Sequence, residues 1–105
     1  MNTDFLKYNR NGNIKYLHVD YNLINDLYVP PRVKILTASF NKLEKDNLES
    51  VCEGLHKCPE LEEVDFSFNN VRKGTNYKLK LLSGNPKLKH IDGLKVTKID
   101  REMME

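Results

Sequence analysis

The sequence predicts an α/β fold: a short right-handed solenoid with about four parallel strands on its concave face. Two observations support this prediction. Apolar residues recur three times at the fixed spacing L-x-x-L-x-L-x-x-N-x-L, and the tripeptide Ser-Phe-Asn occurs at both 39–41 and 67–69. Repeats of this kind are typical of stacked units that bury a shared core. A chain of 105 residues has room for a single domain, 1–105.

Three complete copies of the spacing define three repeats over residues 14–74. Their members are Ile14, Leu17, Val19, Asn22 and Ile24; Val33, Leu36, Ala38, Asn41 and Leu43; and Leu61, Val64, Phe66, Asn69 and Val71. A fourth, partial copy consists of Leu88, Ile91 and Gly93. In each copy, apolar residues at the fourth and sixth slots alternate with others, which predicts a short strand with one buried face. We expect these strands to pair in parallel, about 4.8 Å apart.

An asparagine follows each complete strand, at Asn22, Asn41 and Asn69. An amide side chain carries both donors and acceptors, so it can satisfy turn backbone groups that the core hides from water. We therefore assign a structural role to all three asparagines. Losing one is expected to cost about 1–3 kcal/mol.

The segments that connect the strands differ in kind. The first carries Pro30-Pro31, which suits an extended segment without backbone donors. The second predicts a helix near 46–57, capped by Asp46, with an apolar face formed by Leu48, Val51, Cys52 and Leu55. The third predicts a short helix that begins at Thr75 and ends at Ser83-Gly84.

Both ends of a solenoid need covers, because terminal repeats expose core. Residues 1–13 contain two β-like runs around Asn11-Gly12, which predicts an N-terminal hairpin that covers the open sheet edge. Residues 75–99 form the expected C-terminal cap. The tail is 100–105, and we expect its last five residues, 101–105, to fray.

The cap region has a distinctive order: an aromatic residue, a double leucine, the pattern NPxLxxxDG and a closing valine. These positions are Tyr77, Leu81, Leu82, Pro86, Leu88, Ile91, Asp92, Gly93 and Val96. Together with the repeats, over residues 14–99, this pattern resembles the leucine-rich repeat family, in the branch with a C-terminal LRR cap. That branch includes a spliceosomal snRNP subunit, the nuclear mRNA export receptor TAP, acidic nuclear phosphoproteins and a dynein light chain.

The repeat template also places candidate partner-binding residues on or beside the concave face. They are Tyr16, His18, Tyr21, Ile35, Phe40, Glu63, Asp65, Phe68 and His90. Tyr21, Phe40 and Phe68 share one slot, and an exposed apolar row of this kind indicates a protein-binding surface. The alternative is that each ring packs locally over its own turn.

Two carboxylates, Asp65 and Asp92, are expected to be neighbours on adjacent strands. Their repulsion, on the order of 1 kcal/mol in water, would be relieved by a basic group of a partner. The alternative is a structural hydrogen bond of Asp92 within the cap. The leading functional hypothesis is a non-enzymatic module that binds a protein through the concave face.

The charge distribution suggests a second hypothesis. Net charge is +2, but residues 44–65 hold eight acidic and two basic residues, whereas 72–98 hold eight basic and one acidic. A ribonucleoprotein component could use this basic cap to contact RNA or an RNA-binding protein. The possible contact residues are Lys78, Lys80, Lys87, Lys89 and Lys95.

Other function classes have little support in the sequence. No serine or cysteine lies in a nucleophile motif and no Gly-rich loop precedes a helix, so we expect no enzyme, no metal and no cofactor. No apolar run reaches the ~20 residues of a membrane span, and residues 1–12 lack a signal peptide's apolar stretch. We expect an intracellular monomer, cytoplasmic or nuclear, with Cys52 and Cys58 as buried free thiols.

Overall fold

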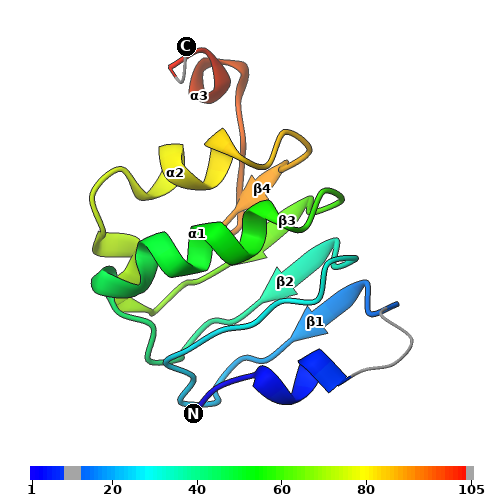
Figure 1. The fold of residues 1–105 in the computed structure, drawn as a ribbon. Coiled ribbons are helices and arrows are strands. Elements are labelled where there is room, and N and C mark those ends of the chain that lie inside the picture. The colour runs from blue at the N-terminus through cyan, green and yellow to red at the C-terminus, as the bar shows by residue number, and fades with distance from the viewer. Residues whose placement is uncertain (9–12, 104–105) are drawn as a thin grey trace.

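The computed structural model describes residues 1–8 and 13–103 and has an α/β fold with a five-stranded, mostly parallel sheet (Figure 1). Four parallel strands follow one another in chain order, and the fifth pairs antiparallel with the fourth. The strands are β1 (Tyr16–His18), β2 (Ile35–Thr37), β3 (Glu63–Asp65), β4 (His90–Ile91) and β5 (Leu94–Lys95).

Helices cover one face of this sheet. Figure 1 shows α1 and α2 side by side on that face, with α3 beyond them near the C-terminus. The helices are α1 (Leu48–His56), α2 (Tyr77–Ser83) and α3 (Lys98–Glu102), and the 3-10 helices are η1 (Asp4–Tyr8), η2 (Lys45–Asn47) and η3 (Asn70–Lys73). We call the opposite, uncovered side of the sheet the open face.

The strand register predicted from the repeat spacing is confirmed. Tyr16 pairs with Ile35, Ile35 with Glu63, and Glu63 with His90. One residue of each parallel strand is buried in the core, as the alternation predicts. These residues are Leu17, Leu36, Val64 and Ile91.

The predicted apolar face of the second connection is also confirmed, although α1 is shorter than 46–57. Its buried residues are Leu48, Val51, Cys52 and Leu55. The 3-10 helix η2 precedes α1, and its N-cap is Glu44 instead of the expected Asp46. Asn47 Oδ1 accepts a hydrogen bond from the backbone N–H of Glu44 at 2.7 Å. Cys52 and Cys58 are both free and buried, as predicted.

The N-terminal hairpin prediction is wrong for its first strand, because Asp4–Tyr8 form the 3-10 helix η1. The reason lies in Thr3, which is buried and exchanges two hydrogen bonds with the backbone of Tyr28, at 2.8 and 2.6 Å. These bonds tie the chain to the first connection, and Leu6 packs against the core. The expected turn at Asn11-Gly12 lies outside the described residues.

A hairpin occurs instead at the other end of the sheet. Asp92 and Gly93 both have positive φ, 54° and 82°, and join β4 to β5. Two-residue hairpin loops of this type need positive φ at both positions, which explains the Asp-Gly pair. The antiparallel strand β5 was not predicted.

In the described part of the tail, α3 continues through Glu102. Thr97 Oγ1 accepts a hydrogen bond from the N–H of Asp100, and the Asp100 carboxylate accepts one from the N–H of Thr97, so α3 begins with a capping box. Arg101 then anchors α3, because its guanidinium donates to four carbonyl oxygens, those of Leu82, Asn85, Pro86 and Leu88.

Candidate interaction surface

Two buried asparagines hold the turns that follow the strands. Asn41, 6% exposed, accepts hydrogen bonds from the N–H groups of Asn22 and Ile24 and donates to the carbonyls of Val19, Ala38 and Ser39. Asn69, also 6% exposed, accepts from Leu43 N–H and donates to Ala38, Phe66 and Ser67. The structural role predicted for these two residues is confirmed.

The buried role predicted for Asn22 is wrong. Asn22 is exposed, and its amide donates only to the nearby carbonyl of Asp20 at 2.9 Å. The physical reason is its position: Asn41 and Asn69 each bridge to the preceding turn, but β1 is the first strand and has no earlier turn to hold.

Tyr21, Phe40 and Phe68 form a column of stacked rings, which we call the aromatic column. The ring centroids are 4.5 Å apart between Tyr21 and Phe40 and 4.1 Å apart between Phe40 and Phe68, with nearly parallel planes. The side chains remain exposed, at 73%, 39% and 70% respectively. The rings therefore pack on one another, across successive turns, at the surface of the protein.

The backbone sets this stacking distance. The N–H of Tyr21 donates to the carbonyl of Ser39, and the N–H of Phe40 donates to that of Ser67, each at 3.0 Å. Successive turns are therefore spaced like neighbouring strands, about 4.8 Å apart. Flat rings at one slot then fall within stacking distance.

The backbone holds the residues of the column in a strained conformation. Tyr21, Phe40 and Phe68 have φ of 60°, 56° and 61°, in the left-handed region. This conformation costs about 1–2 kcal/mol for each bulky residue, or about 3–6 in all. Two stacked pairs return about 0.5–1.5 kcal/mol each, or about 1–3, in addition to the gain from burying their touching faces. Glycine or asparagine would suit these turns better, so the strained, exposed rings make the column a candidate functional surface.

The strands place the other predicted binding residues on the open face. Tyr16 is 61% exposed and His18 is also exposed, whereas Ile35, Glu63 and His90 are half-buried. His90 Nδ1 lies 3.4 Å from a carboxylate oxygen of Glu63. Among the described residues, no group of three or more metal-ligating side chains comes together.

A polar network that was not assigned from the sequence lies beside them. Asp20 accepts hydrogen bonds from the hydroxyl of Thr37 and from both the N–H and the hydroxyl of Ser39, at 2.7–2.9 Å. Thr37 Oγ1 also lies 2.7 Å from Nδ1 of His18. Burial raises the pKa of Asp20, but the hydrogen bonds from Ser39 and Thr37 outweigh it, so the net pKa is lowered.

The expected repulsion between Asp65 and Asp92 does not need a basic partner. Asp65 accepts a hydrogen bond from the N–H of Ser67 at 2.9 Å. The side chain of Asp92 is 5% exposed, and it accepts hydrogen bonds from the N–H of Phe66 at 2.7 Å and from the hydroxyl of Tyr77 at 2.9 Å. The structural alternative for Asp92 is therefore confirmed.

Four of the five candidate RNA-contacting lysines pair with carboxylates of the same chain. The pairs are Lys78 with Asp100, Lys80 with Glu49, Lys87 with Glu60, and Lys89 with Glu62. Lys95 is exposed. The stacking of successive repeats therefore brings part of the acidic stretch against part of the basic stretch. Many of the opposite charges in the two stretches then neutralise each other within the chain.

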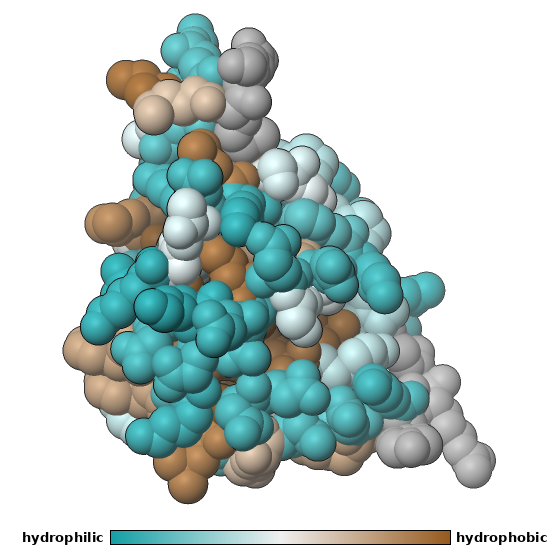
Figure 2. Space-filling view, turned by 60° about the vertical axis from the view of Figure 1, so that its left-hand side comes forward, coloured by the Kyte–Doolittle hydropathy of each residue, from teal (hydrophilic) through white to brown (hydrophobic). Residues whose placement is uncertain are grey.

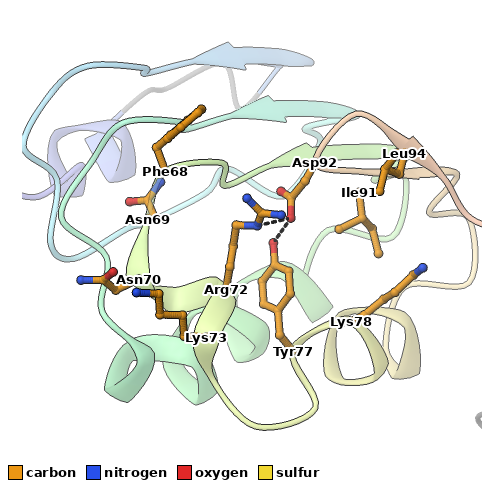
Figure 3. Close-up of a pocket in the computed structure, with 10 residues that line it drawn as sticks. All are labelled: Phe68, Asn69, Asn70, Arg72, Lys73, Tyr77, Lys78, Ile91, Asp92 and Leu94. Carbon is orange, nitrogen blue, oxygen red and sulfur yellow. Dashed lines mark hydrogen bonds and ion pairs between the residues drawn. The ribbon is translucent and has the colours of Figure 1, made fainter.

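Two hollows flank Phe68, and neither was predicted. One, of about 330 Å³, runs along the aromatic column and includes Leu23 and Lys42. The other, of about 650 Å³, lies between η3, α2 and the β4–β5 hairpin (Figure 3). Elsewhere, Figure 2 shows a face covered mostly by hydrophilic side chains, with apolar atoms exposed between them.

Comparison with known proteins adds no assignment, because no protein-family model matches the chain and no curated protein matches its sequence. Within residues 1–8 and 13–103, none of the helices has the length and apolar character needed to cross a membrane.

Proposed function

We propose that this chain is a short leucine-rich-repeat solenoid that acts as a non-enzymatic protein-interaction module. Three features support the solenoid: the strand register, the repeated hydrogen bonding of Asn41 and Asn69, and the resemblance of residues 14–99 to the family. The open face is then the concave face, and the partner lies across it and along the aromatic column.

The aromatic column is the observation that carries the proposal. Its three residues adopt a strained left-handed backbone conformation, and its rings expose apolar area to water. Burial against a partner converts this area into binding energy, since aromatic side chains dominate the energetics of many interfaces. Phe40 is central, because it contacts both of the other rings. Tyr16 and His18, exposed on the open face, extend the surface.

The ribonucleoprotein alternative has less support. Lysines that already pair with Glu49, Glu60 or Glu62 must give up those contacts to meet phosphates. Phe40 also has a ring on each face, so it offers no free face to a nucleobase, whereas single-strand binding depends on free aromatic faces. A partner protein can bind the column without releasing these lysines and without inserting a ring between the stacked aromatic faces.

The test is affinity capture from the native cell followed by titration of the purified main partner. We expect Phe40→Asp combined with Tyr16→Ser to weaken binding about tenfold or more, the loss typical of an interface anchor. The matched control is Lys57→Asp combined with Glu53→Lys, two exposed positions on or next to α1, which should leave binding unchanged. If both double variants bind like the wild type, the surface is assigned wrongly.

A further inference from the structure

The larger hollow beside Phe68 combines apolar walls with a cationic rim. Ile91 is buried at its base, and Leu94, 69% exposed, and Phe68, 70% exposed, stand at its sides. Figure 3 shows Arg72 and Tyr77 both pointing toward Asp92 between these walls. A volume of about 650 Å³ lies in the range of pockets that bury a small-molecule ligand, which leaves room for a large side chain.

The charged side chains around this hollow are three cations, Arg72, Lys73 and Lys78, and one carboxylate, Asp92. Asp92 is already neutralised, because Arg72 Nε lies 3.0 Å from it and the Tyr77 hydroxyl donates to it. Lys78 pairs with Asp100 outside the hollow. In the described parts of the chain, the terminal nitrogens of Arg72 and the Nζ of Lys73 have no such partner.

We propose that this hollow binds an acidic segment of a partner protein. One aliphatic or aromatic side chain of the segment enters between Phe68 and Leu94, and flanking carboxylates contact Arg72 and Lys73. The pair with Asp92 holds the Arg72 guanidinium in place, with its two terminal nitrogens free for bidentate contact with a carboxylate. This proposal rests on the proposed function and names its partner class, because Phe68 belongs both to the hollow and to the aromatic column.

An acidic protein segment fits better than a nucleic acid. The walls offer aliphatic surface from Ile91 and Leu94, which suits an apolar side chain and gives nothing to a base edge. The polar groups of Asp92 are satisfied within the chain and are not available to read a base. Positive charge at the rim then complements carboxylates on either side of an apolar anchor.

The experiment selects binders to the full chain from a display library of short random peptides. Recovered peptides are synthesised with a fluorescent label, and their affinities are measured by anisotropy. Each is compared with two of its own variants, one with acidic residues changed to amides and one with the apolar anchor changed to alanine. Protein variants are Lys73→Glu and Leu94→Ser, with Lys95→Glu as the matched control, since Lys95 borders a different hollow.

We expect acidic peptides with one apolar anchor to be enriched. Lys73→Glu and Leu94→Ser should each weaken their binding about tenfold, and Lys95→Glu less than about twofold. Three results overturn the inference: no enrichment, enrichment of peptides that Lys73→Glu and Leu94→Ser leave unaffected, or tighter Lys73-dependent binding of a labelled oligouridine. If Phe40→Asp abolishes binding of peptides that ignore Lys73→Glu, only this inference fails and the interaction module stands.

Discussion

Asn41 and Asn22 occupy the same repeat position, yet only Asn41 is buried, and this difference gives a matched pair of mutations. Replacing Asn41 by alanine removes the acceptor for the N–H groups of Ile24 and Asn22, the first buried and the second half-buried. The carbonyl of Ala38 keeps its hydrogen bond from Asn69. Each buried group left unpaired costs about 1–3 kcal/mol, so we expect Asn41→Ala to lower the free energy of unfolding by about 2–6 kcal/mol. That is a large part of the roughly 5–15 kcal/mol that stabilises a typical domain.

Asn22→Ala should cost less than about 0.5 kcal/mol, because the Asn22 side chain is exposed and makes one local hydrogen bond. The assay is urea unfolding followed by far-ultraviolet circular dichroism, with both variants and the wild type fitted to a common slope. Equal costs for the two substitutions, or a larger cost at Asn22, would refute the account of how amides hold the turns.

Three further predictions concern titratable and terminal groups. Burial raises the pKa of both Cys52 and Cys58 to about 11, so a thiol-specific dye at about pH 8 should leave the native protein unlabelled and react with two thiols after unfolding; labelling of the native state would contradict their burial. Burial and the neighbouring charge of Asp92 raise the pKa of Tyr77, so the contribution of Tyr77 to stability is complete below about pH 10 and falls as the pH rises further. The Tyr77→Phe variant should therefore lose less stability than the wild type above about pH 10. Equal losses of stability for the two proteins in alkaline urea titrations would contradict this prediction. Arg101→Ala should lower the free energy of unfolding by about 1.5–3 kcal/mol and speed hydrogen exchange in α3 and at the end of α2. Unchanged exchange in these two helices would show that Arg101 does not anchor the tail.

The strand register was predictable because it depends on one-dimensional spacing. Buried slots such as Leu36 and Val64 recur at a fixed distance from a turn asparagine, and this distance is enough to align Ile35 with Glu63. Parallel pairing then follows, because consecutive strands are joined by long connections.

The N-terminus could not be read in the same way. The conformation of the N-terminal segment depends on Thr3, which makes two hydrogen bonds to the backbone of Tyr28. The repeat spacing does not relate these two positions. The Asp92-Gly93 hairpin carried a usable signal, since this dipeptide favours two-residue hairpin loops. In the sequence analysis, Asp92 and Gly93 were assigned only to the cap pattern, so the hairpin that they form was not predicted.

The candidate site was predictable as a set of slots but not as a surface. Spacing placed Tyr21, Phe40 and Phe68 in one row, but the choice between stacking and local packing depends on side-chain rotamers. The role of Arg101 and the hollow beside Phe68 both come from contacts across the C-terminal part of the chain, which no periodicity in the sequence encodes.

Site-specific photo-crosslinking tests most directly the claim that the aromatic column binds a protein. A benzophenone-bearing phenylalanine analogue replaces Phe40 in one version of the chain and exposed Lys57, beyond the C-terminal end of α1, in another, and both are irradiated in the native cell. We predict one dominant protein adduct at position 40 that is absent at position 57. Adducts that are equally weak and heterogeneous at both positions would contradict the claim.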